Sequence, residues 1–329
     1  MHSVILVREK RKGMIMLDKW QREINYIRIS ITDRCNFNCS YCNPQNNQHL
    51  NHKDILSYEE IIKIANCLIK IGIVNFKITG GEPTLRKDYQ FLIKELKKIE
   101  GVNTVTLTTN GSLFSYEDLD ELKRIGIDGI NFSIDTLNKV EYQQICQNDA
   151  LDKVLDNLLY ANKIGIKVKV NCVVNEEFKI NRVNELLKLI KDNDIALRFI
   201  EVMPLKYSLR SNKISLLNKY LIEKYKLSEC CIKLGNGPAQ YYQIAGYRGY
   251  IGFIEALHHK FCYQCNRIRL SSTGDLKLCL FHNDMINIRD YIDDEEKLTE
   301  VLKKAIYNKP KEHNFEDENS ETLMNQIGG

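Results

Sequence analysis

Three cysteines stand close together in the first part of this 329-residue chain, at Cys35, Cys39 and Cys42. Three thiolates on one short loop can bind three irons of a [4Fe–4S] cluster and leave the fourth iron open to a small molecule. Structural zinc normally takes four protein ligands, and His49 and His52 are the nearest residues that could complete such a site. A set of buried, apolar cysteines is the third interpretation. The spacing favours the iron–sulfur cluster over the other two.

A second group of three cysteines lies near the C-terminus, at Cys262, Cys265 and Cys279. Zinc is a stronger alternative here, because C-x₂-C pairs are common in zinc sites. The residues that could supply a fourth ligand are His258, His259, His282, Cys230 and Cys231. Cys67 and Cys172 are expected to be small core residues. Spacing alone therefore predicts a metal site here and leaves both metals open.

The charge balance limits the classes of partner. The chain has 47 Lys and Arg against 43 Asp and Glu, a net charge of +4. That excess is too small to predict binding to nucleic acid or to a membrane surface, but it permits a local cationic site for an acidic ligand. No apolar run is long enough for a membrane span, and the short apolar stretch 4–7 has its charges on the wrong side for a secretory signal. We expect a cytoplasmic protein, whose clustered cysteines are metal ligands and not disulfides.

Apolar runs of strand length alternate with helical patterns in the first two thirds of the chain. The expected strands are 26–31, 74–79, 104–109, 129–134, 168–174 and 195–202. Helices are expected after the capping pairs Ser57/Glu60 and Ser115/Asp118, and over 149–164, 181–191 and 293–306. Such alternation predicts a parallel sheet flanked by helices, either doubly wound or an incomplete (β/α) barrel. No G-x-G-x-x-G follows the first strand, which disfavours a dinucleotide-binding fold.

The first cysteine loop, with its lead-in Thr32-Asp33-Arg34, resembles the C-x₃-C-x₂-C motif of radical S-adenosylmethionine (SAM) enzymes. Within that superfamily, the segment 261–270, Cys279 and the terminal Gly328-Gly329 are similar to the GTP 3′,8-cyclases of molybdenum cofactor biosynthesis. The resemblance covers about Asp18 to Gly329. It implies a partial TIM-type barrel of six (β/α) units over residues 18–203, closed on its open side by a C-terminal region, 204–329. Residues 1–17 are then an N-terminal extension that need not be ordered.

The resemblance also implies two [4Fe–4S] clusters and SAM as cofactors. Reduction of the first cluster would cleave SAM to a 5′-deoxyadenosyl radical, while the second cluster would bind the guanine base of GTP. The expected SAM contacts are Tyr41, Gly81, Ser133 and Met203. The residues expected to line the GTP site are Arg28, Lys77, Thr108, Lys169, Arg198, Arg267, Ile268 and Arg269. We expect Arg267, Arg269, Gly328 and Gly329 to take part in catalysis.

The implied product is (8S)-3′,8-cyclo-7,8-dihydroguanosine 5′-triphosphate. The expected partners are an electron donor and a downstream cyclic pyranopterin monophosphate synthase, and the sequence leaves the oligomeric state open, a homodimer being one alternative. Lys77 stands where many relatives have arginine; it keeps the charge and loses the two-pronged geometry. Two other interpretations compete with the cyclase: a radical SAM enzyme that modifies a peptide, and a non-catalytic metal module that carries electrons or is stabilised by zinc.

Overall fold

A curved parallel sheet forms the centre of the computed structural model, which describes residues 7–10, 13–42, 49–205, 208–315 and 327. Its strands are β4 (Tyr26–Ser30), β5 (Asn75–Thr79), β6 (Thr104–Thr109), β7 (Gly129–Ser133), β8 (Val168–Val174) and β9 (Ile195–Glu201). They lie side by side in chain order, all parallel. Each strand expected from the sequence is confirmed to within one residue at either end.

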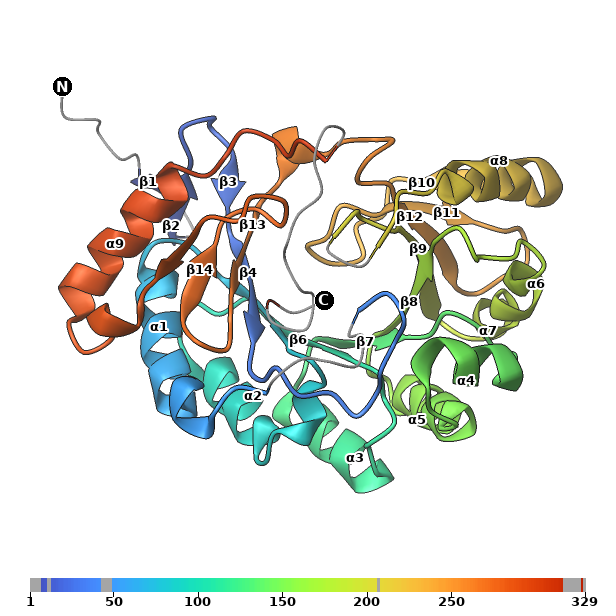
Figure 1. Ribbon diagram of the computed structural model, residues 1–329, viewed down its shortest axis with the longest axis horizontal. Coiled ribbons are helices and arrows are strands. Elements are labelled where there is room, and N and C mark those ends of the chain that lie inside the picture. The colour runs from blue at the N-terminus through green and yellow to red at the C-terminus, as the bar shows by residue number, and fades with distance from the viewer. Residues whose placement is uncertain (1–6, 11–12, 43–48, 206–207, 316–326, 328–329) are drawn as a thin grey trace.

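Helices cover the outer, convex side of this sheet (Figure 1). They are α1 (Tyr58–Lys70), α2 (Tyr89–Lys98), α3 (Tyr116–Ile125), α4 (Lys139–Cys146), α5 (Leu151–Lys163), α6 (Arg182–Leu186) and α7 (Lys188–Lys191). Both expected capping boxes are present, on Ser57 and on Ser115. The single helix expected over 181–191 is divided at Leu187. The half-barrel class is confirmed, and the doubly wound alternative is wrong because the sheet curls with all of these helices outside.

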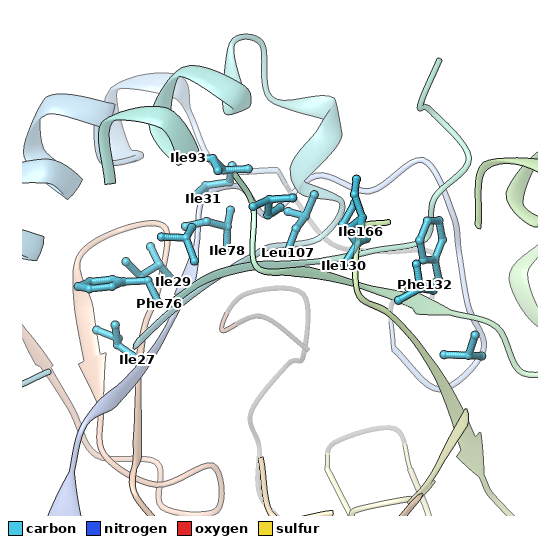
Figure 2. Packing of buried hydrophobic residues seen from close by; sticks show 14 of the residues in the cluster. Ile27, Ile29, Ile31, Phe76, Ile78, Ile93, Leu107, Ile130, Phe132 and Ile166 are labelled. Carbon is cyan, nitrogen blue, oxygen red and sulfur yellow. The ribbon is translucent and has the colours of Figure 1, made fainter. Parts of the chain in front are cut away.

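Alternation along the strands decides what faces inwards. Ile27, Ile29, Phe76 and Ile78 are fully buried in the main hydrophobic core, which lies between strands and helices. Figure 2 shows these side chains gathered there with Ile93 of α2. Since successive side chains of a strand point to opposite faces, the polar residues between them point to the concave inner face.

The C-terminal region extends both edges of the half-barrel. On one side β12 (Tyr250–Ile254) pairs parallel with β9, followed by β11 (Gln240–Gln243) and β10 (Ser228–Cys230). On the other side β13 (Arg267–Leu270) pairs parallel with β4, followed by β14 (Asp275–Lys277) and β15 (Met285–Asn287). Two further helices are α8 (Lys213–Tyr225) and α9 (Glu295–Tyr307). The segment 255–266 thus runs from β12, beside one edge of the half-barrel, to β13, beside the other, and all of these strands belong to one twelve-stranded sheet.

The N-terminal stretch contributes a small sheet of its own. Among its described residues, β1 (Val7–Lys10) and β2 (Gly13–Leu17) form an antiparallel sheet with β3 (Glu23–Ile24). Met16 is fully buried in the main core. Gly72 allows this close approach: a Cβ there would lie 2.4 Å from the carbonyl oxygen of Met14. In the described part of the chain, no helix has the length and apolar character needed to cross a membrane.

Candidate functional site

The first cysteine loop follows β4 directly. Its three thiols are free and partly exposed. Burial raises the pKa of Cys35 to about 12, and it raises the pKa of Cys42 further, with added repulsion from the other two thiolates. A hydrogen bond with Cys146 and burial raise the pKa of Cys39. These thiols therefore need a positively charged centre to hold them as thiolates, and an iron–sulfur cluster fits that need.

Two glycines after β5 hold the loop in place. A Cβ on Gly81 would lie 2.3 Å from the carbonyl oxygen of Arg34, and one on Gly80 would lie 2.8 Å from that of Thr32. The Gly81 amide donates to the Thr32 carbonyl at 2.7 Å, and the Glu82 amide donates to the Arg34 carbonyl at 2.7 Å. The sequence suggested that these glycines admit SAM; in the structure their first effect is to admit the backbone of the cysteine loop.

Gly81→Ala is expected to destabilise the apo protein by about 1–3 kcal/mol, because a buried methyl group would push the loop away from β5. Chemical denaturation under anaerobic conditions measures the free energy of unfolding. Gly237→Ala is the matched control, since nothing lies within 4 Å of a Cβ built there. Equal stability of the two variants would contradict the packing argument.

A buried carboxylate connects the loop to the next strand ends. Glu82 accepts hydrogen bonds from the Thr109 hydroxyl at 2.7 Å and from the Asn110 amide at 2.6 Å. The Asn110 side chain donates to Asn36 of the cysteine loop at 2.9 Å. Burial raises the pKa of Glu82. The Gly80–Glu82 turn and the end of β6 thus form one polar network beneath Cys35.

The end of α4 supports the other side of the loop. The amides of Asn38 and Ser40 donate to the carbonyls of Cys146 and Ile145, each at 3.1 Å. The rings of Phe37 and Tyr142 pack edge to face, with centroids 6.1 Å apart. No sequence pattern suggested this role for α4.

The expected SAM contacts surround this loop. The Tyr41 hydroxyl donates to Asp135 at 2.7 Å, just beyond Ser133 at the end of β7. Burial raises the pKa of Asp135, which also accepts the Val173 amide at 2.7 Å. Met203 follows β9 and packs in a small apolar cluster that also includes Cys279 of the second group. The structure therefore brings Tyr41, Gly81 and Ser133 to one edge of the sheet, as expected for barrel sites.

The second cysteine group lies near the other end of β4. Arg267 at the start of β13 pairs with Tyr26 at the start of β4, so Cys265 lies at that end. The buried Arg22 donates to the Cys262 carbonyl at 2.8 Å and pairs with Asp18 at 2.6 Å. Burial would raise the pKa of Cys265, but the charges of Lys309, Arg267 and Arg22 outweigh it and lower that pKa to about 7.

The geometry bears on the choice of metal. Among the residues that the structure describes, no three His, Cys, Asp or Glu side chains converge tightly enough to hold a single metal ion. A single zinc ion needs such convergence, whereas each thiolate of a [4Fe–4S] cluster binds a different iron and the thiolates lie further apart. The described residues thus contain no preformed site for a single zinc ion at either cysteine group.

Basic residues gather on the concave face between the two groups. We call Arg28, Lys77, Lys169, Arg198 and Arg269 the cationic face. Arg28 lies beside Lys77 on one side and Arg269 on the other in the sheet register. Within the described ranges, no ion pair with a carboxylate side chain is formed by Arg28, Lys77, Lys169 or Arg198. Lys77, only 7% exposed, has no hydrogen bond there either.

Burial and neighbouring positive charges lower the pKa values of two lysines on the cationic face. Burial and the charges of Arg28, Arg198 and Lys169 lower the pKa of Lys77 well below its usual value. Burial and Arg198 lower the pKa of Lys169 to about 7. Arg198 has a buried Nε without a partner in the described structure. Buried cations without counter-charges call for an anion with several charges, such as a polyphosphate.

The remaining predicted residues differ in placement. Thr108 accepts a hydrogen bond from Asn131 at 3.1 Å on the inner face. Arg267 lies over the Phe261 ring. Ile268 is buried in the main core and points away from the cationic face, because it alternates with its two arginine neighbours. Gly328 and Gly329 lie outside the described residues, but the carbonyl of Ile327 accepts a hydrogen bond from Arg269 at 3.5 Å.

Two family models match the chain in succession. Residues 29–190 match the radical SAM superfamily, and residues 195–315 match Molybdenum Cofactor Synthesis C. A GTP 3′,8-cyclase of Peptoclostridium acidaminophilum is 40% identical over 329 residues, covering 96% of this chain and 98% of the relative. A GTP 3′,8-cyclase of Clostridium perfringens strain 13 is 38% identical over 326 residues, covering 95% and 100%.

Solved structures share the fold. SuiB of Streptococcus suis bound to S-adenosylmethionine superposes with a TM-score of 0.61 at 17% identity, covering 84% of this chain and 66% of that one. Native anSMEcpe with bound AdoMet gives a TM-score of 0.52 at 22% identity, covering 61% and 60%. At these identities the likeness shows the fold alone.

Proposed function

The chain belongs to the GTP 3′,8-cyclase family of the radical SAM superfamily, and from that premise we propose that its two cysteine groups bind two [4Fe–4S] clusters at opposite ends of one substrate site. As a family member it is an enzyme that uses SAM and an iron–sulfur cluster to act on GTP. The observation that carries the proposal is the cationic face, which lies between the two groups. Cys35 follows the end of β4, Cys265 lies beside its start, and Arg28 lies between them.

The size of this arrangement suits two small molecules. β4 spans five residues, which is roughly 13 Å from first to last at about 3.3 Å per residue. SAM would lie at the end near Cys35, Tyr41 and Gly81, with GTP between it and the second group. When bound, the first cluster and SAM would supply the one-electron chemistry that removes a ribose hydrogen, and the second cluster would supply an open iron for the guanine base.

The chain's own residues hold the nucleotide. Arg28, Lys77 and Lys169 would bind the triphosphate, whose negative charges compensate these otherwise unbalanced cations. Arg267 and Arg269 would fix the nucleotide from β13. Binding at both ends of GTP restricts its motion, which the closure of a new bond between sugar and base requires. The proposed product is (8S)-3′,8-cyclo-7,8-dihydroguanosine 5′-triphosphate. The proposed partners are an electron donor and a downstream cyclic pyranopterin monophosphate synthase.

Anaerobic incubation with GTP, SAM and dithionite tests the function. Mass spectrometry should detect 5′-deoxyadenosine together with a cyclised nucleotide of the same mass as GTP, and metal analysis should find about eight irons per chain. About four irons would contradict the second cluster. Abundant zinc, or 5′-deoxyadenosine without any cyclised nucleotide, would contradict the cyclase.

GTP binding should weaken as the pH rises above about 7. Below that pH Lys169 is already protonated in the free enzyme; above it, binding must restore the proton, since the triphosphate favours the charged lysine. The dissociation constant should rise by up to about tenfold per pH unit from this group. Anaerobic calorimetry at pH 8 in two buffers of different ionisation enthalpy measures proton uptake directly.

Lys169→Gln should take up about one proton fewer than the wild type on binding GTP at pH 8. Lys163→Gln, which removes an exposed lysine at the end of α5, is the control and should bind like the wild type. Unchanged proton uptake in the Lys169 variant would refute its role as a phosphate contact.

A further inference from the structure

The two cysteine groups lie in opposite electrostatic surroundings. The first has two buried carboxylates beside it: Glu82 raises the pKa of Cys35, and Asp135 raises that of Cys39 and Cys42 after the larger effects of burial and neighbouring thiols. The second has basic residues of three separate segments beside it, before β3, within β13 and after α9, together with one carboxylate, Glu312. Such a difference in nearby charges changes the energy of placing a negative charge on a cofactor bound by either group.

Among these basic residues, Lys309 is a buried lysine whose positive charge no other described residue neutralises. It follows α9 and is 2% exposed. Its carbonyl accepts the indole N–H of Trp20 at 3.1 Å, which holds its backbone, and its ammonium donates to the carbonyl of Leu278, the residue before Cys279. Within the described ranges it forms no ion pair with a carboxylate. Burial raises the pKa of Cys262 and the Lys309 charge only partly opposes it, whereas for Cys265 the Lys309 charge is the largest of the effects that outweigh burial and lower the pKa.

Lys277 is a second buried lysine close to Cys279, and its ammonium also donates to a backbone carbonyl. It lies in β14, is 1% exposed, and donates to the carbonyl of His282. Two buried ammonium groups with only carbonyl partners are costly unless a negative group lies near them. A cluster with three thiolates would be that group.

We propose that Lys309, assisted by Lys277, is a positioning residue that stabilises the reduced form of the second cluster, so that the second cluster accepts an electron before the first. This inference rests on the proposed function, because it requires a cluster on Cys262, Cys265 and Cys279. Reduction adds one negative charge to a cluster. Nearby ammonium groups stabilise that charge, and the carboxylates beside the first group oppose it. Each cluster takes one electron from the titrant, and no bond forms or breaks.

A reductive titration of the full-length enzyme with dithionite, followed by electron paramagnetic resonance, tests the order. Added SAM identifies the signal of the first cluster by shifting it. In the wild type the second signal should appear first. In Lys309→Met the ratio of reduced to oxidised second cluster at a fixed potential should fall about tenfold, which is 59 mV for one electron, with the first cluster unchanged.

The controls separate charge from structure. Lys309→Arg keeps the charge and should titrate close to the wild type, and Lys304→Met removes an exposed lysine of α9 and should have no effect. If Lys309→Met does not take up the second cluster, Lys277→Met decides by the same measurement. The proposal is overturned if the first cluster is reduced first in the wild type, or if Lys309→Met with full iron keeps the wild-type midpoint. A wild type with only about four irons would overturn the proposed function instead.

Discussion

Cys42→Ala is expected to halve the iron content, from about eight to about four per chain, and to abolish 5′-deoxyadenosine formation. Two remaining thiolates on the first loop cannot hold three irons of a cluster, so SAM loses the open iron that cleaves it. The second group lies at the other end of β4 and should keep its own cluster. Iron analysis and anaerobic SAM-cleavage assays on the same preparation measure both effects.

Two further cysteine variants make this result specific. Cys279→Ser should also lose about four irons, yet it should still cleave SAM, because the first group is complete. Cys67→Ala changes a buried cysteine of α1 and should keep both clusters. Loss of all iron in Cys279→Ser would show that the two sites depend on each other, and SAM cleavage by Cys42→Ala would show that the first loop does not hold the reactive cluster.

The Arg267→Ala, Arg269→Ala double variant is expected to cleave SAM while forming about 10²–10⁴ times less cyclised nucleotide. Both arginines come from β13, on the concave side opposite the buried Ile268. Each charge-assisted contact to the nucleotide contributes about 1.5–3 kcal/mol, and about 1.4 kcal/mol corresponds to a factor of ten in rate. The ratio of cyclised nucleotide to 5′-deoxyadenosine, measured in one reaction, reports the effect.

That ratio is the decisive quantity because it cancels differences in iron loading and in the amount of folded enzyme. Arg248→Ala, which removes an exposed arginine whose guanidinium donates to the Asp192 carbonyl at 3.3 Å, is the matched control and should keep the wild-type ratio. A double variant that keeps the wild-type ratio of cyclised nucleotide to 5′-deoxyadenosine would remove both arginines from the GTP site.

Much of the half-barrel could be predicted because its signals are local. The six strands are short apolar runs between helices whose starts carry Ser57 and Ser115 caps, and both features depend on neighbours in the sequence. The strand at residues 13–17 could not be predicted, because the signal for it is not local. β2 is ordered by β3, by α9 and by the close approach that Gly72 allows, none of which the first seventeen residues encode.

The sequence by itself determined the possible chemistry: two groups of three thiols whose spacing suits iron–sulfur clusters, and a set of basic residues inside apolar strands. Only the tertiary structure decided how these groups act on one another. Sheet register places Arg269 and Lys77 on either side of Arg28, turns Ile268 away, and puts the two cysteine groups at opposite ends of β4. Within the part of the chain that the structure describes, burial then leaves Lys77 and Lys309 without carboxylate partners. The physical reason is that ligand chemistry belongs to single side chains, whereas charge balance depends on every segment that packs around them.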